Sequence, residues 1–170
     1  MIADEITAPE RLNATHDISS FDSGVSQLDE WLKRHALANE QKNVSRTYVV
    51  CAKGRVVGYY TLANGAIAHA EVRAKTKRNL PNPIPVMVLG RLAVDKAYQD
   101  HHLGSSLLRD AILRTLQAAE IAGIRAMLVQ AISENAKKFY EHCGFSACAV
   151  DPMTLMITLT EIKAQLESEA

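Results

Sequence analysis

The first third of the chain shows two successive patterns of apolar and polar residues. The first has the spacing of a helix, and the second is typical of strands. From Gly24 to Ala38 apolar residues recur every three or four positions, and Asp22 and Ser23 precede them as candidate caps. The stretches Thr47–Ala52 and Val56–Leu62 are rich in β-branched and aromatic residues, with a turn signal between them. This pattern predicts one helix followed by a β-hairpin.

The remainder of the chain alternates between strand and helix patterns. Residues 67–85 are irregular, and three prolines near the end of this stretch exclude a helix there. Beyond them we expect a strand, a long amphipathic helix, a strand, a short helix and a last strand, over Val86–Val94, Gly104–Ala122, Arg125–Ala131, Glu134–His142 and Met153–Leu159. The acidic tail after these elements is expected to fray. The order predicts a single domain over residues 1–170 of the α/β (α+β) class, with a mixed sheet and at least one βαβ crossover.

The composition is that of a soluble protein. Hydrophobic residues make up 48% and charged residues 22%, and no apolar run approaches the ~20 residues of a membrane-spanning helix. The acidic start of the chain lacks the basic and apolar parts of a secretory signal. The three cysteines form no CxxC pair, and the histidines show no metal-ligand spacing. We therefore expect a cytoplasmic protein with no membrane segment and no metal site.

Charge is distributed unevenly, although Lys plus Arg and Asp plus Glu both number 19. Residues 1–30 hold seven acids and one base, residues 33–91 hold eleven bases and two acids, and residues 92–170 hold seven bases and ten acids. A basic middle third suits a phosphate-rich partner. The alternative is that charges separated along the sequence mix in space.

The segment Tyr98–Ser106 joins a predicted apolar strand to the start of the longest predicted helix. At a helix start the first backbone N–H groups lack intrahelical partners, and the helix dipole favours an anion there. Gly104 allows a ligand to approach the backbone closely, and Ser105 and Ser106 add hydroxyl donors. These features predict an anion or phosphate site, or alternatively a turn that only packs.

The same segment resembles the acetyl-CoA pyrophosphate motif of GNAT N-acetyltransferases, Q/R-x-x-G-x-G/A, aligned here on Gln99–Gly104. The flanking strand and helix agree with that family, as do Asn135, Phe139-Tyr140 and Gly144-Phe145 further along. The resemblance implies the GNAT fold, a mixed central sheet flanked by helices, and an acetyltransferase with acetyl-CoA as co-substrate. His102 stands at the first motif glycine, where a side chain crowds the pyrophosphate unless φ is negative. This departure implies either altered affinity or a weakened or lost site.

The resemblance also implies roles for individual residues. Tyr140 is the implied acid for the departing thiolate, whereas the residues alone favour a packing role for Phe139 and Tyr140. No general base is obvious, because Glu134 lies where it would complement a helix dipole. A backbone N–H of the strand Leu92–Val94 is implied to polarise the thioester. The implied acetyl-CoA-binding residues are Leu92, Ala93, Val94, Gln99, Asp100, His101, His102, Leu103, Gly104, Ser105, Ser106 and Asn135.

Longer segments resemble a narrower group, the GNAT toxins of bacterial type II toxin–antitoxin modules of the TacT/KacT/AtaT kind. They are Phe21-Asp-Ser-Gly, Leu28-Asp-Glu-Trp-Leu, Arg46-Thr-Tyr-Val-Val-Cys, Val57-Gly-Tyr-Tyr-Thr-Leu, Pro83-Ile-Pro-Val-x-Val-Leu-Gly-Arg-Leu-Ala-Val-Asp and Ala136-x-x-Phe-Tyr. This resemblance implies acetylation of the α-amino group of aminoacyl-tRNA, which blocks translation. It further implies a cognate antitoxin of ribbon-helix-helix type, contact with operator DNA only through that antitoxin, and a homodimer.

Basic residues are candidates for the tRNA backbone, because phosphate contact needs positive charge but little precise geometry. Arg91 interrupts an apolar strand, so it is either paired inside or directed at the substrate. Two other functions remain open: a GNAT enzyme acting on a protein or small-molecule amine, and a catalytically weak GNAT-fold binding module in a DNA-binding toxin–antitoxin complex. The candidate tRNA contacts are Arg73, Lys75, Lys77, Arg78, Arg91, Lys33 and Arg34, with Lys137 and Lys138 as additions.

Overall fold

The structure is a computed structural model that describes residues 5–74 and 79–169. Its strands are β1 (Glu10–Arg11), β2 (Arg46–Ala52), β3 (Arg55–Ile67), β4 (Ile84–Val94), β5 (Ala126–Gln130), β6 (Ser146–Ala147) and β7 (Thr154–Thr158). Its helices are α1 (Ser26–Trp31), α2 (Leu37–Gln41), α4 (Leu103–Ala119), α5 (Glu134–His142) and α6 (Leu159–Glu169). A π turn (Leu32–Ala36) joins α1 to α2, and short 3-10 turns cover His69–Glu71 and Lys96–Tyr98.

The strands follow the order β1-β2-β3-β4-β5-β7-β6 in a mixed sheet. β4 and β5 are parallel, with Val86–Leu89 opposite Ala126–Val129, and α4 is the chain segment that connects them. The pairs β1–β2, β2–β3, β5–β7 and β6–β7 are antiparallel. The predicted α/β class and its βαβ crossover are therefore confirmed.

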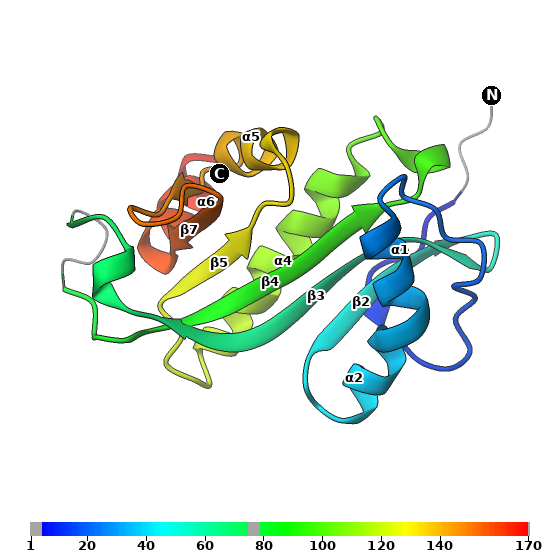
Figure 1. Cartoon of the computed structure of the whole chain (residues 1–170), viewed down its shortest axis with the longest axis horizontal. Helices are drawn as coiled ribbons and strands as arrows, with labels where there is room; N and C mark the ends of the chain where they lie inside the picture. Colours follow the sequence, from blue (N-terminus) through cyan, green and yellow to red (C-terminus); the bar gives the residue numbers. More distant parts are fainter. Residues whose placement is uncertain (1–4, 75–78, 170) are drawn as a thin grey trace. The chain divides into compact units, whose positions relative to one another are not determined.

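The chain divides into two compact units, one of residues Met1–Ala63 and Gly90–Ala111 and the other of Asn64–Leu89 and Ile112–Ala170. β3, β4 and α4, which are labelled in Figure 1, each contribute residues to both units. The first holds the start of α4 and the loop before it, and the second holds α5.

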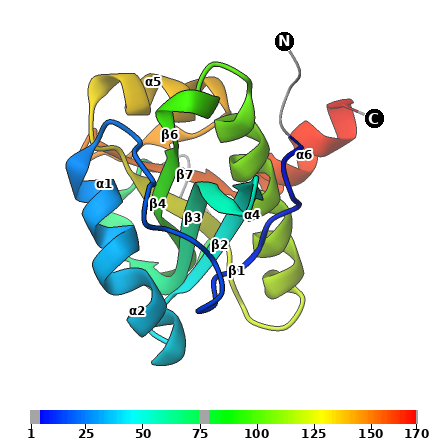
Figure 2. The same cartoon turned by 90° about the vertical axis from the view of Figure 1, so that its right-hand side faces the viewer.

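In the first unit, α1 and α2 cover one face of β2 and β3 (Figure 2). Leu28, Trp31 and Leu32 of this helical segment share a core with Val49 and Tyr59. The opposite face of β3 packs on α4. The close approach is seen at Gly58, where an added Cβ would lie 3.0 Å from the Leu107 side chain. With both faces covered, the near-continuous apolar run of β3 is explained.

In the second unit, β4, β5 and β7 contribute to a core that includes Ile84, Ala126 and Met156. The Ser133 hydroxyl accepts the Ala136 N–H at 3.1 Å, so the predicted cap of α5 is confirmed. Gly144 follows the same helix with a φ of 103°, a conformation in which glycine is unstrained.

Three predictions about element ends are wrong. α1 begins at Ser26 with Val25 at its N-cap, because the side chains of Asp22 and Ser23 make other contacts. The tail expected to fray forms α6, whose Ile162 is only 2% exposed and fixes the helix by packing. β4 starts at Ile84 rather than Val86, since the fixed φ of the intervening proline suits an extended chain.

Glu40 at the end of α2 is a buried carboxylate that joins the helix to two strands. Its side chain is 6% exposed and pairs with Arg11 at 2.9 Å and Arg46 at 2.7 Å. Its Oε1 also accepts the Thr47 N–H at 3.3 Å. Burial by itself would raise the pKa of Glu40, but the hydrogen bonds from Arg11 and Arg46 hold that pKa below its ordinary value.

We predict that Glu40→Gln lowers the free energy of unfolding at neutral pH by about 2 kcal/mol, because two guanidinium groups lose their counter-charge. The folded-state pKa of Glu40 is lowered, so its stabilisation is present above the unfolded-state pKa and is lost as the pH falls through the folded-state value. Urea unfolding at several pH values should therefore show the difference from wild type shrinking below about pH 4.

The matched control is Glu30→Gln, which removes the exposed ion pair with Arg34. That variant should lose only about 0.3 kcal/mol. Equal destabilisation by the two variants would contradict the proposed role of Glu40.

Candidate active site

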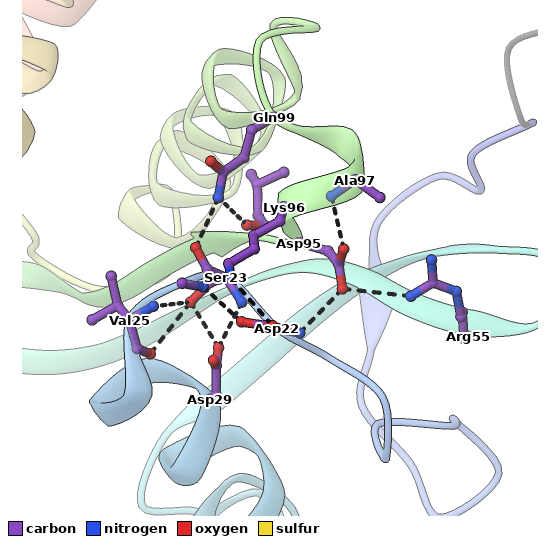
Figure 3. A network of polar contacts seen from close by, with 11 residues as sticks. Asp22, Ser23, Val25, Asp29, Arg55, Asp95, Lys96, Ala97 and Gln99 are labelled. Atoms are coloured by element: carbon purple, nitrogen blue, oxygen red, sulfur yellow. Dashed lines mark hydrogen bonds and ion pairs between the residues drawn. The ribbon is translucent and has the colours of Figure 1, made fainter.

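β4 ends beside a buried carboxylate that fixes the turn after it. Asp95 is 5% exposed, and its Oδ1 accepts the Ala97 N–H at 3.0 Å to start the 3-10 turn. Its Oδ2 accepts the Asp22 N–H at 3.1 Å and pairs with Arg55 at 3.4 Å (Figure 3). Since both carboxylate oxygens are bound, the direction of the chain is set before the loop to α4 begins.

The loop enters α4 through His102. The His102 carbonyl accepts both the backbone N–H and the hydroxyl of Ser106, each at 3.1 Å. Both Ser106 donors are thus used within the helix. The N–H groups of Leu103, Gly104 and Ser105 precede Ser106 in the first turn of α4. Those N–H groups and the helix dipole favour an anion at this end. The anion site remains a prediction, and the groups available for it here are mainly backbone N–H groups.

His102 has a φ of 61°, and Asp100 has a φ of 65°. The negative φ that would relieve crowding at His102 is therefore not present. The residue instead adopts the left-handed conformation that glycine favours, which histidine tolerates better than most residues. Its side chain is exposed. The loop thus keeps the backbone course of a glycine turn, with an imidazole at its surface.

Gln99 is engaged by the protein itself. Its Nε2 donates to the Val94 carbonyl at 2.8 Å and to the Ser23 carbonyl at 2.9 Å (Figure 3). A carboxamide has two N–H donors, and here both point at backbone oxygens. The implied contact between Gln99 and acetyl-CoA stays a prediction, and its observed side-chain contacts join the end of β4 to the segment before α1.

Arg91 lies on an aromatic stack in the first unit. Its guanidinium carbon is 4.1 Å from the ring centroid of Trp31, which stacks on Tyr59 at 6.1 Å. Burial lowers the pKa of Arg91. No carboxylate of residues 5–74 or 79–169 forms an ion pair with it. Arg91 is thus held by a cation–π contact rather than paired with an acid.

α5 carries Asn135 and Tyr140 in the second unit. Tyr140 is 6% exposed and packs edge-on against Phe139 and Phe145, with ring centroids 5.2 and 5.7 Å away. Burial raises the pKa of Tyr140, so its phenol remains protonated well above neutral pH. Asn135 is exposed in the first turn. A protonated phenol can donate to an anion formed beside it.

The predicted tRNA contacts belong to both units. Lys33 and Arg34 lie in the π turn of the first unit, where Arg34 pairs with Glu30 at 2.7 Å. Arg73 is exposed in the second unit. The remaining basic candidates of this stretch lie outside the described residues; they are Lys75, Lys77 and Arg78.

Among residues 5–74 and 79–169, no three His, Cys, Asp or Glu side chains gather closely enough to hold a metal ion. Cys51, Cys143 and Cys148 are free thiols. In the same described ranges, no helix is long and apolar enough to cross a membrane.

Sequence reasoning did not predict the contacts of Asp95, Trp31 and the segment Asp22–Ser23 with residues of the candidate site. Trp31 was predicted only as a core residue, because the spacing of apolar residues does not show what covers an indole ring. The contacts of Asp95 come from residues distant in the sequence. The available signal was an acid directly after an apolar strand, a position from which it can cap the next turn.

Residues 43–147 match the family model described as "Acetyltransferase (GNAT) domain". The match includes the loop into α4, Arg91 and the helix that carries Tyr140. The chain therefore belongs to the GNAT acetyltransferase family, and the fold predicted for it is confirmed.

Particular relatives are toxins of this family. A tRNA-acetylating toxin of Mycobacterium tuberculosis (strain ATCC 25618 / H37Rv) is 46% identical over 158 residues, which cover 93% of this chain and 95% of that protein. AtaT complexed with acetyl-methionyl-tRNAfMet is similar in structure, with a TM-score of 0.88, 28% identity and coverage of 95% of this chain and 99% of that one.

Two further solved structures show AtaT with other molecules. A tyrosine-to-phenylalanine mutant of AtaT bound to the C-terminus of the antitoxin AtaR and acetyl-CoA matches with a TM-score of 0.82 and 28% identity, covering 96% of this chain and 99% of that one. The AtaT–AtaR complex bound to DNA matches with a TM-score of 0.77 and 27% identity, covering 94% and 99%.

The left-handed conformation of His102 generates a stability prediction. His102→Gly should be more stable than His102→Val by about 1–2 kcal/mol, because a β-branched residue is strained at positive φ whereas glycine is not. Urea unfolding of both variants and the wild type measures this difference. A valine variant as stable as the glycine variant would mean that the turn has another conformation.

Proposed function

We propose that this protein transfers an acetyl group from acetyl-CoA to the α-amino group of aminoacyl-tRNA and thereby blocks translation. The observation that carries the proposal is the first turn of α4, whose backbone N–H groups and dipole favour an anion, in a chain 46% identical to a tRNA-acetylating toxin. Acetyl-CoA and tRNA both present phosphate groups, which suit the helix start and the basic middle third of the chain.

Acetyl-CoA is held mainly by backbone in this proposal. The N–H groups of Leu103, Gly104 and Ser105 receive the pyrophosphate, and the strand Leu92–Val94 pairs with the pantetheine arm and polarises the thioester carbonyl. Asn135 supports the arm from α5. Backbone donors fixed by secondary structure need little reorganisation during the reaction, which favours the developing negative charge.

Tyr140 supplies the proton for the departing thiolate. The raised pKa keeps its phenol protonated, so it donates as the carbon–sulfur bond breaks. The attacking amine needs no strong base, because the α-amine of an aminoacyl ester is less basic than a lysine amine. Water-mediated deprotonation of that amine is sufficient.

Arg91, together with Lys33 and Arg34, receives the tRNA. The guanidinium of Arg91 is oriented by Trp31 and is not paired with an acid of the described chain, so its N–H donors suit a phosphate. Lys33 and Arg34 lie on the same helical segment as Trp31, just beyond it in the chain. Contacts between these side chains and the phosphate backbone of tRNA would add affinity without selecting a nucleotide sequence.

Regulation in this proposal follows that of toxin–antitoxin modules. A cognate antitoxin of ribbon-helix-helix type neutralises the enzyme, and the complex reaches operator DNA through the antitoxin. The active toxin is a cytoplasmic homodimer. The antitoxin and its contact with DNA extend to this chain what its structural neighbours contain, namely AtaR and DNA. The ribbon-helix-helix type, the homodimer and the cytoplasmic location follow from the resemblance to toxins of such modules.

The proposal is tested by incubating the protein with labelled acetyl-CoA, charged tRNA, uncharged tRNA and a mixture of protein and small-molecule amines. Label should appear on charged tRNA only. Label on protein or small amines, with none on tRNA, would support a different GNAT acceptor. No binding of acetyl-CoA by calorimetry would support a binding module instead.

We predict that Tyr140→Phe lowers kcat at least about 100-fold, because the phenolic proton is lost while the ring still packs. Calorimetry should show unchanged affinity for acetyl-CoA. Tyr48→Phe, a change of the same kind on β2, is the control and should keep normal kcat. Wild-type kcat in Tyr140→Phe would mean that another group protonates the thiolate.

We also predict that Arg91→Gln reduces the slope of log tRNA affinity against log salt by about one, because one phosphate contact is lost. Arg91→Lys should keep much of the slope but bind more weakly, since an ammonium lacks the planar stacking group. Fluorescence anisotropy with labelled tRNA measures both. Exposed Arg125 gives the control, Arg125→Gln, and an equal change in that variant would argue against a specific role for Arg91.

A further inference from the structure

A network of polar contacts joins the loop before α4 to the segment before α1 (Figure 3). Three backbone groups of Asp22 and Ser23 are bound by residues 95–99. The Asp22 N–H donates to Asp95 at 3.1 Å, the Asp22 carbonyl accepts the Lys96 N–H at 2.8 Å, and the Ser23 carbonyl accepts Gln99 at 2.9 Å. The two segments lie more than 70 positions apart in the sequence, so only tertiary structure brings them together.

The network continues from Ser23 into α1. The backbone N–H and hydroxyl of Ser23 both donate to Asp29, at 2.9 and 2.7 Å, and Ser23 is only 8% exposed. Asp29 lies in α1 two residues before Trp31, the residue on which Arg91 stacks. Within the first unit, these contacts and the part of α1 between Asp29 and Trp31 thus lead from the proposed acetyl-CoA loop to the proposed tRNA contact.

Gln99 is the side chain that closes this connection. Its amide donates to the last carbonyl of β4 and to Ser23 at once, so it fixes the strand proposed to polarise the thioester against the entry to α1. With both donors directed at backbone oxygens, Gln99 has no donor left for a phosphate in this arrangement.

We propose that Gln99, together with Asp95, is a positioning residue. It holds the loop before α4, which is the proposed acetyl-CoA loop, in a fixed arrangement with α1, whose Trp31 orients the proposed tRNA contact Arg91. Gln99 then acts through β4 and α1 rather than as a ligand of the pyrophosphate. This inference rests on the proposed function and adds to it a coupling between the two substrates.

The decisive experiment compares two acetyl donors. Acetyl-pantetheine carries the same thioester as acetyl-CoA but has no pyrophosphate. Gln99→Met removes both amide donors with little change in length, and it should lower kcat about tenfold with either donor, because the β4 end and α1 are released in both cases. A loss confined to acetyl-CoA would make Gln99 a pyrophosphate ligand and overturn the proposal, as would normal kcat with both donors.

Amide hydrogen exchange provides a readout that needs no activity. The N–H groups of Asp22 and Lys96 form hydrogen bonds between the segment before α1 and the loop before α4. Both should therefore exchange about tenfold faster in Gln99→Met than in wild type. Unchanged exchange at both positions would also overturn the proposal. Gln117→Met, at an exposed position of α4, is the matched control and should leave kinetics and exchange unchanged.

A milder variant covers the case in which Gln99→Met does not fold. Gln99→Asn keeps the amide donors but is one methylene too short to reach both carbonyls, so it should show the same changes in smaller degree. If wild-type protein acetylates no tRNA, the proposed function fails. Hydrogen exchange still tests whether Gln99 holds the loop before α4 against the segment before α1. The donor comparison can then be made with whichever amine the wild type does acetylate.

Discussion

The buried carboxylate of Asp95 is the interaction on which the proposed acetyl-CoA site depends. It stands where β4 ends and satisfies backbone N–H groups of two segments, one from the 3-10 turn and one from the entry to α1. A buried charge is stable only when it is hydrogen-bonded or paired, and here Arg55 completes its partners. The loop to α4 therefore starts from a fixed point.

The two proposed phosphate sites of the first unit are built by different means. The start of α4 uses backbone N–H groups and the helix dipole, and needs no basic side chain. Arg91 uses a guanidinium held on Trp31, where burial costs part of its hydration and no acid of the described residues compensates the charge. Both arrangements belong to the first unit, whereas the proposed acid Tyr140 belongs to the second.

The sequence was sufficient for features that depend on local patterns. The apolar stripe of α4, the Ser133 cap and the strand before the loop are each determined by neighbouring residues, and the structure confirms them. The contacts of Asp95 and Gln99 could not be predicted, because their partners are distant in the sequence and are mostly backbone atoms. The prediction that the C-terminal tail frays was wrong. The tail is mostly charged and polar, and the sequence pattern did not show that Ile162 is buried and holds α6 in place.

The central claim is that the acetyl group is placed on the α-amine of the amino acid carried by tRNA. Charged tRNA incubated with the protein and acetyl-CoA can be digested with nuclease, and the released aminoacyl-adenosine analysed by mass spectrometry. The expected product carries one acetyl group on the α-amine and none on the adenosine. Unmodified aminoacyl-adenosine from an enzyme that binds acetyl-CoA would contradict it.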